Sequence, residues 1–254
     1  ELRVDLGPLA VVAYLGAPTT FSENTSWQTP TIHNWDGDPV GRIDPDNRWY
    51  KATLRLVETA AADAAGNYLI TLPDLGGSID TLANMRGPEN LLMDLYDHPQ
   101  AVLAGADRIT DAWEEAFAAI YAGITAAGAG ASSWLRIWSD RPYTVMTCDF
   151  NFSISPDQFR RFCMPSLADH ARPAGRAVIH VDGPGAVKHI ESIAADPDIT
   201  AVQYTPGAAT PSPLDKIDWF RIAQQAGKPI IINAPAEDRS EERRVGKECS
   251  SRWS

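Results

Sequence analysis

The chain has 254 residues, of which 44% are hydrophobic, and its formal net charge at pH 7 is -11. This length suits one α/β domain with a sizeable core, and the acidic balance disfavours binding to nucleic acids or to anionic membrane surfaces. No apolar run approaches the ~20 residues of a membrane span. Residues 1–238 contain only two cysteines, Cys148 and Cys163, which indicates a reducing compartment without a disulfide framework, so we expect a cytoplasmic protein.

The C-terminal tail, residues 239–254, differs in character from the rest of the chain. Residues 239–249 read RSEERRVGKEC, which matches the translation of a DNA adapter used in sequencing. The tail contains five Lys or Arg and three Asp or Glu, so the remaining residues carry a net charge of about -13. We expect residues 1–238 to form the domain and residues 239–254 to be a non-native tail outside the fold.

Strand and helix patterns alternate along residues 1–238. Short apolar and β-branched runs predict six strands, at about residues 2–6, 68–72, 134–138, 177–181, 200–204 and 229–233. Helical periodicity and capping residues predict helices at about residues 9–15, 48–65, 78–86, 88–96, 99–127, 155–171, 185–195 and 215–226. Residues 18–46 are rich in Pro, Thr, Asn and Asp and predict a long excursion.

Strands that alternate with helices predict a parallel sheet with right-handed crossovers. Polar residues follow five of the predicted strands: Asp74, Ser139, His180 with Asp182, Gln203 with Tyr204, and Asn233. In a barrel of eight parallel strands, such carboxyl ends form the face that carries the chemistry. We therefore expect an α/β fold of the (β/α)8 TIM-barrel type, with an open doubly wound sheet as the alternative. The chain contains no Gly-x-Gly-x-x-Gly after a strand and no Walker loop.

The segment from Ala177 to Ala186, AVIHVDGPGA, carries the main candidate site. His180 and Asp182 are two residues apart on an extended segment, so their side chains point the same way. A converging imidazole and carboxylate can hold a metal or exchange protons. The alternative is a histidine satisfied by a neighbouring carbonyl group and an aspartate that caps the next helix. Substrate binding is predicted for Asp74, Arg141, Tyr204 and Asn233, because each lies near a predicted strand end.

Four groups of motifs along the chain occur in a characteristic order. They are Leu15-Gly16 with Phe21-Ser-Glu23, Arg86-Gly-Pro-Glu-Asn90 with Asp97-His-Pro-Gln-Ala101, Ile154-Ser-Pro-Asp-Gln-Phe159 with Met164-Pro165, and His180-Val-Asp-Gly-Pro184. In these motifs the chain resembles the uroporphyrinogen decarboxylase superfamily, which includes porphyrinogen decarboxylases and zinc methyltransferases that serve corrinoid proteins. The resemblance covers nearly all of residues 1–238 and implies a (β/α)8 barrel truncated at both ends, with about strands two to seven present.

The chain departs from the methyltransferase branch of this superfamily at one position. The strand that holds His180 usually reads His-x-Cys in that branch, and Asp182 stands here in place of the cysteine. The resemblance implies a divalent metal held by His180 and Asp182, with zinc expected, since zinc accepts both imidazole and carboxylate. Loss of the thiolate widens the choice of metal. Two ligands are too few for a closed site, so the third must come from Asp149, Cys148 or a strand outside this chain.

Three functional hypotheses follow from the residues and the resemblance. In the first, His180 and Asp182, with Asp149 or a residue outside this chain as third ligand, hold a metal, and a methyl group moves to or from a corrinoid, with a corrinoid protein as partner. In the second, Asp182 or Asp149 stabilises a protonated pyrrole of a tetrapyrrole substrate before CO2 leaves, and His180 or Tyr204 supplies a proton. In the third, the barrel binds a small molecule without chemistry. The paired His and Asp, and the few cations other than Arg141 near strand ends, favour the first hypothesis.

Overall fold

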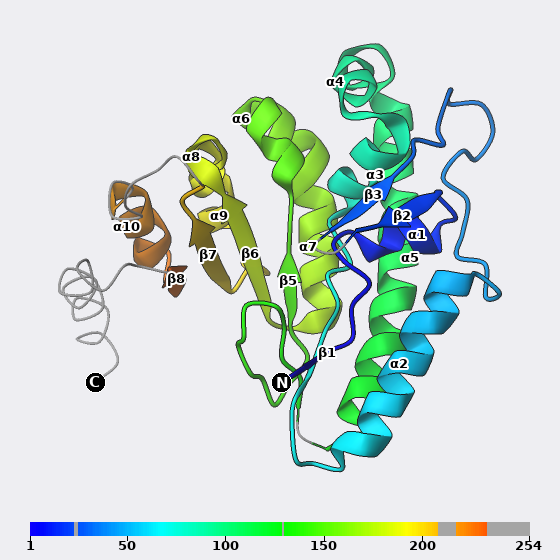
Figure 1. The fold of residues 1–254 in the computed structure, drawn as a ribbon. Coiled ribbons are helices and arrows are strands. Elements are labelled where there is room, and N and C mark those ends of the chain that lie inside the picture. The colour runs from blue at the N-terminus through cyan, green and yellow to red at the C-terminus, as the bar shows by residue number, and fades with distance from the viewer. Residues whose placement is uncertain (23–24, 129, 208–216, 233–254) are drawn as a thin grey trace.

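The structure, a computed structural model, describes residues 1–22, 25–128, 130–207 and 217–232, and its centre is a set of parallel strands flanked by helices (Figure 1). The larger sheet has the order β5-β6-β7-β8, and β1 pairs with β4 in a separate two-stranded sheet. These strands are β1 (Leu2–Arg3), β4 (Ile70–Thr71), β5 (Thr144–Met146), β6 (Ala177–Asp182), β7 (Ala201–Thr205) and β8 (Ile230–Ile232). Every neighbouring pair among them is parallel, as the alternation of strands and helices predicts.

A single bridge extends the β1–β4 pair. Ser132 forms a parallel β-bridge with Thr71 of β4, and the Ser132 backbone N–H donates to the carbonyl oxygen of Ile70 at 3.1 Å. The strands of the described residues form a parallel α/β array compatible with part of a TIM-type barrel, and they do not close into a barrel.

Helices follow the strands in chain order. They are α1 (Ala10–Tyr14), α2 (Arg48–Ala64), α3 (Ser78–Arg86), α4 (Pro88–Asp97), α5 (Pro99–Thr125), α6 (Pro156–Gln158), α7 (Met164–Ala174), α8 (Gly183–Ala186), α9 (Ile190–Ala195) and α10 (Ile217–Gln225). Short 3-10 segments are η1 (Asp149–Ser153) and η3 (Val187–His189), and η2 (Phe159–Cys163) is a π-helical turn. The helix starts follow local chemistry: Ser155 and Gln158 form a capping box, and the Asn47 side chain accepts hydrogen bonds from two backbone N–H groups of α2.

Helix α5 contributes many buried side chains to the core and lies beside α2 (Figure 1). Its fully buried residues Val102, Ile109, Trp113, Ile120 and Ile124 recur at helical spacing and form one face. Helix α7 also packs against α5, and its buried His170 ring stacks on the Trp113 ring with centroids 4.1 Å apart.

One predicted strand, residues 134–138, is wrong. Residues 134–135 form a turn in which the Arg136 N–H donates to the Ser133 carbonyl oxygen at 2.7 Å, and Arg136 has a left-handed φ of 58°. The segment is apolar except for Arg136, which resembles a buried strand, but it forms a loop that is closed by an antiparallel bridge between Ala131 and Ser139. The next strand along the chain is β5, which begins at Thr144.

Other predicted elements are shorter or outside the described residues. The predicted excursion at residues 18–46 contains an unpredicted antiparallel hairpin, β2 (Thr19–Phe21) with β3 (Ser26–Gln28). Residues 239–254 lie outside the described residues, so the division of the chain at 238 stays a prediction.

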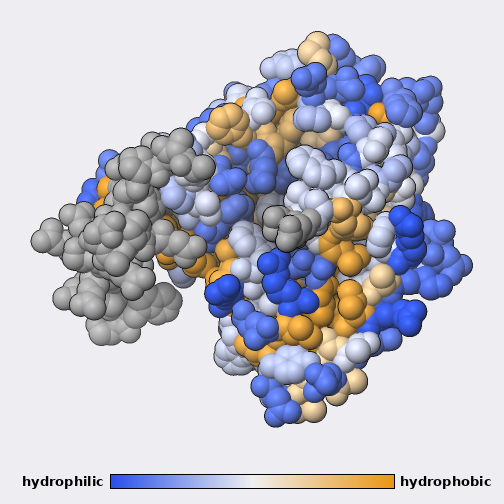
Figure 2. All heavy atoms as spheres, in the orientation of Figure 1, coloured by the Kyte–Doolittle hydropathy of each residue, from blue (hydrophilic) through white to orange (hydrophobic). Residues whose placement is uncertain are grey.

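Figure 2 shows apolar residues among hydrophilic ones on the face of the molecule that Figure 1 presents. Among the described helices, none is long and apolar enough to cross a membrane.

Candidate metal centre

Three side chains gather at the carboxyl ends of β5 and β6. Asp149 opens η1 directly after β5, while His180 and Asp182 lie on β6, and each offers a ligand atom within 4.8 Å of the other two. The two strands are parallel neighbours, so their carboxyl ends lie at the same edge of the sheet. The predicted convergence of His180 and Asp182 is confirmed, and this cluster of Asp149, His180 and Asp182 could hold a metal ion.

Gln203 orients the imidazole of His180. It lies opposite His180 in the register of β6 and β7, and its Oε1 atom is hydrogen-bonded to the Nδ1 atom of His180. An amide oxygen only accepts, so Nδ1 must carry the proton and donate, which leaves the Nε2 lone pair for a ligand. The Gln203 amide nitrogen in turn donates to Thr205 Oγ1 at 3.1 Å. This chain of polar contacts fixes one tautomer of His180.

Asp80 binds the backbone at Asp149 by hydrogen bonds. Asp80 is buried in the first turn of α3, and its two carboxylate oxygens accept hydrogen bonds of 2.9 Å from the backbone N–H groups of Asp149 and Phe150. Burial raises the pKa of Asp80, the charge of Asp149 adds to the rise, and the two backbone N–H groups oppose it. Asp80 was not predicted from the sequence, because an acidic residue in the first turn of a helix is an ordinary helix-dipole partner.

Asp74 belongs to the same electrostatic environment. It follows β4, and its Oδ1 atom accepts a hydrogen bond from the Gly76 N–H at 2.9 Å. Burial raises the pKa of Asp74 to about 6; the Gly76 N–H lowers the pKa, the charge of Asp149 raises it further, and His180 lowers it. The pKa of Asp149 is also raised, first by desolvation, while His180 lowers it and Asp182 raises it. The centre therefore concentrates carboxylates around one imidazole, a setting that favours a bound cation.

The structure does not bring the predicted Tyr204 and Arg141 into this centre. Successive residues of a strand face opposite sides, so Gln203 faces His180 while Tyr204 is buried against Phe220 of α10, with ring centroids 5.5 Å apart. Arg141 precedes β5 instead of following a strand, and its backbone N–H donates to Ser139 Oγ at the amino end of the sheet. Both residues therefore lie outside the cluster of Asp149, His180 and Asp182, and their substrate-binding roles stay predictions.

Two further predicted residues have different outcomes. Cys148 is buried, and the pKa of its thiol is raised well above the usual range, first by a hydrogen bond with Cys163 and then by burial. It is therefore engaged with Cys163 and is not in the cluster with Asp149. Asn233 lies outside the described residues, so its predicted role stays a prediction.

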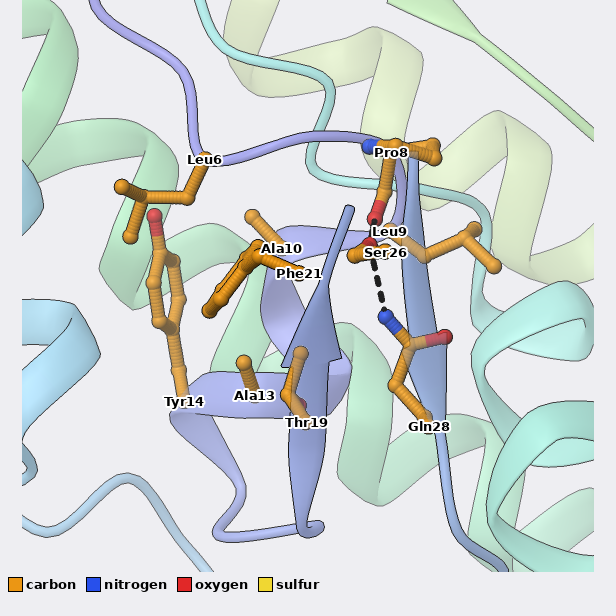
Figure 3. A pocket seen from close by; sticks show the side chains of 10 residues that line it. All are labelled: Leu6, Pro8, Leu9, Ala10, Ala13, Tyr14, Thr19, Phe21, Ser26 and Gln28. Carbon is orange, nitrogen blue, oxygen red and sulfur yellow. Dashed lines mark hydrogen bonds between the residues drawn. The ribbon is translucent and has the colours of Figure 1, made fainter. Parts of the chain in front are cut away.

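A separate small cavity lies between α1 and the hairpin β2–β3 (Figure 3). It is lined mainly by apolar side chains. Its polar members include Gln28, whose amide nitrogen donates to Ser26 Oγ at 2.9 Å. The Tyr14 hydroxyl on its rim donates to Thr53 Oγ1 at 2.9 Å. None of the predicted site residues lines this cavity, so its position does not favour it as the site.

Comparisons with known proteins identify the fold. No protein-family model matches the chain, and no curated protein matches its sequence. The structure is similar to a methyltransferase from Methanosarcina mazei with a TM-score of 0.61 and 14% sequence identity, and the match covers 92% of this chain and 74% of the other. A likeness at this identity concerns the fold, and it agrees with the parallel α/β arrangement described above.

Proposed function

We propose that this chain is part of an enzyme of the uroporphyrinogen decarboxylase superfamily that transfers a methyl group with the assistance of a divalent metal and with a corrinoid as methyl carrier. The observation that carries this proposal is the cluster of Asp149, His180 and Asp182 at the carboxyl edge of a parallel sheet. The fold similarity to a methyltransferase supports the class of reaction.

The donor set of the cluster fits a divalent metal. Two carboxylates would balance the charge of the ion, and a neutral imidazole with its Nδ1 proton held by Gln203 presents Nε2 as a ligand. Three protein ligands leave a coordination position for a substrate atom, as in catalytic zinc sites. A metal bound there supplies Lewis-acid activation of the heteroatom that gives or takes the methyl group.

The surrounding residues have positioning roles in this proposal. Gln203 holds the ring of His180, and Asp80 holds the backbone at Asp149, so two ligands are fixed before any ion binds. The Trp134 ring packs edge-on against the His180 ring, with centroids 5.1 Å apart and planes at 84°, and so helps to hold the imidazole in place. Asp74 keeps its proposed role in substrate binding, because it lies within electrostatic reach of Asp149 and His180.

Metal content and methyl transfer, measured on the same preparations, test the proposal. We expect about one divalent ion per chain in the parent protein and its loss, together with methyl transfer, in His180→Ala. The exposed His33 provides a matched control, and His33→Ala should keep both properties. A metal-free protein that is fully active on a porphyrinogen-type substrate would overturn the proposal in favour of decarboxylation. Ligand binding without turnover would favour a binding module.

A further inference from the structure

The short helix that begins at Asp149 is bound near its end by two side chains of η3. The Asn151 carbonyl oxygen accepts a hydrogen bond of 2.9 Å from His189 Nε2, and the Phe152 carbonyl oxygen accepts one of 2.8 Å from Lys188 Nζ. The last carbonyl groups of a helix lack a full set of partners within the helix, so donors from other segments are favourable there. Two neighbouring residues of η3 therefore bind two neighbouring carbonyl groups of η1.

These hydrogen bonds join the two segments that carry the candidate metal ligands. His180 and Asp182 lie on β6, and α8 and η3 follow that strand directly. The Phe152 ring of η1 lies against Gly185 of α8, where an added Cβ atom would come within 2.2 Å of the ring. Asp149 is the candidate ligand that is not on β6, so its distance from Asp182 depends on how η1 is held against α8 and η3.

The His189 side chain supplies a hydrogen bond that an apolar side chain would not. Its ring is buried and stacks on the Phe159 ring with centroids 4.3 Å apart. A backbone carbonyl oxygen only accepts, so Nε2 of His189 carries the proton and donates to Asn151. The Nδ1 atom of His189 is buried without a partner among the described residues, which is unfavourable. An apolar ring would fill the same space without an unpaired nitrogen, so the bond to Asn151 is the contribution specific to the imidazole.

We propose that His189, together with Lys188, is a positioning residue that holds Asp149 within reach of an ion bound by the two ligands on β6. This role rests on the metal-assisted function proposed above. Asp80 binds the backbone at the start of η1, while His189 and Lys188 bind it near the end, so η1 is fixed at both ends. A ligand that is fixed before an ion binds loses little conformational freedom on binding, which raises the affinity for the ion.

Zinc affinities of single and double variants, measured by competition with a chromophoric chelator, test this proposal. We expect His189→Leu to lower the affinity about tenfold, as is typical for residues that support a ligand, and Lys188→Met to lower it as well. In the Asp149→Ala background, neither change should have a further effect, because a positioning residue acts only through the ligand that it holds. His189→Gln keeps an N–H donor and should retain the parent affinity. The exposed His33 and Lys51 supply matched controls, and His33→Leu and Lys51→Met should bind zinc like the parent.

Amide hydrogen exchange of the same proteins without zinc separates this inference from the metal proposal. Exchange over η1 should be faster in His189→Leu than in the parent, whereas exchange over β6 should be unchanged. Equal exchange over η1 in the two proteins would overturn the positioning role, and so would a loss of affinity that persists in the Asp149→Ala background. If His189→Leu does not fold, Lys188→Met, which changes an exposed side chain, takes its place in both measurements. A parent protein that binds no zinc would overturn the metal centre, while faster exchange in the variant would still support the hold of η3 on η1.

Discussion

Gln203 should set the metal affinity of the cluster although it is not a ligand. Its Oε1 atom is the acceptor for His180 Nδ1, and the residue is 1% exposed, so no water takes its place easily. In Gln203→Leu, His180 loses the partner that fixes its tautomer and ring orientation. Loss of such a supporting contact typically lowers metal affinity about 10–100-fold, or about 1.4–2.7 kcal/mol.

Competition of the protein with a chromophoric chelator for zinc at pH 7 measures this affinity directly. Gln203→Glu keeps an acceptor oxygen for His180 and should bind zinc at least as tightly as the parent, which separates a positioning role from a loss of folding. Gln225→Leu makes the same substitution as the main variant at an exposed end of α10 and should bind like the parent. If a folded Gln203→Leu protein binds zinc as tightly as the parent, the positioning role is wrong.

Three further predictions concern stability. Burial lowers the pKa of His170 to about 3, so as the pH falls the unfolded chain binds a proton at this histidine before the folded chain does. Relative to His170→Gln, the parent should therefore lose about 2 kcal/mol of unfolding free energy between pH 7 and pH 5 in denaturant titrations. Asn47→Ala removes the cap of α2 and two bonds to the carbonyl groups of α1, which should cost about 1–3 kcal/mol in the same titrations, and an unchanged midpoint would contradict this. Gly77→Ala places a Cβ atom 2.1 Å from the backbone oxygen of Thr147 and should cost about 1–3 kcal/mol of stability. Gly185→Ala should cost less, because its Cβ atom meets only the exposed ring of Phe152, and equal melting temperatures of the two variants would refute this difference.

Local chemistry predicted those parts of the fold that local residues determine. The capping box at Ser155, the cap at Asn47 and the proline that opens α4 each fix a helix start within a few residues. The same holds for His180 and Asp182, whose spacing on a strand is enough to place them together.

Properties that depend on pairing between distant segments were not predictable in the same way. The choice between Gln203 and Tyr204 depends on the register of β7 against β6, which a single strand pattern does not reveal. Arg141 was misplaced because residues 134–138 form a short apolar run typical of a buried strand, while a left-handed φ at Arg136 breaks the extended chain. Asp80 contacts Asp149 across 69 residues, and nothing near Asp80 in the sequence marks that contact.

X-ray absorption spectroscopy of the zinc-loaded protein tests the metal centre most directly. Ligation by Asp149, His180 and Asp182 predicts a first shell of nitrogen and oxygen atoms at ~2.0–2.2 Å, with the outer-shell scattering of one imidazole. The imidazole signal should disappear in His180→Ala. A sulfur scatterer at ~2.3 Å, which would require a cysteine ligand, or a first shell unchanged in His180→Ala, would contradict the account.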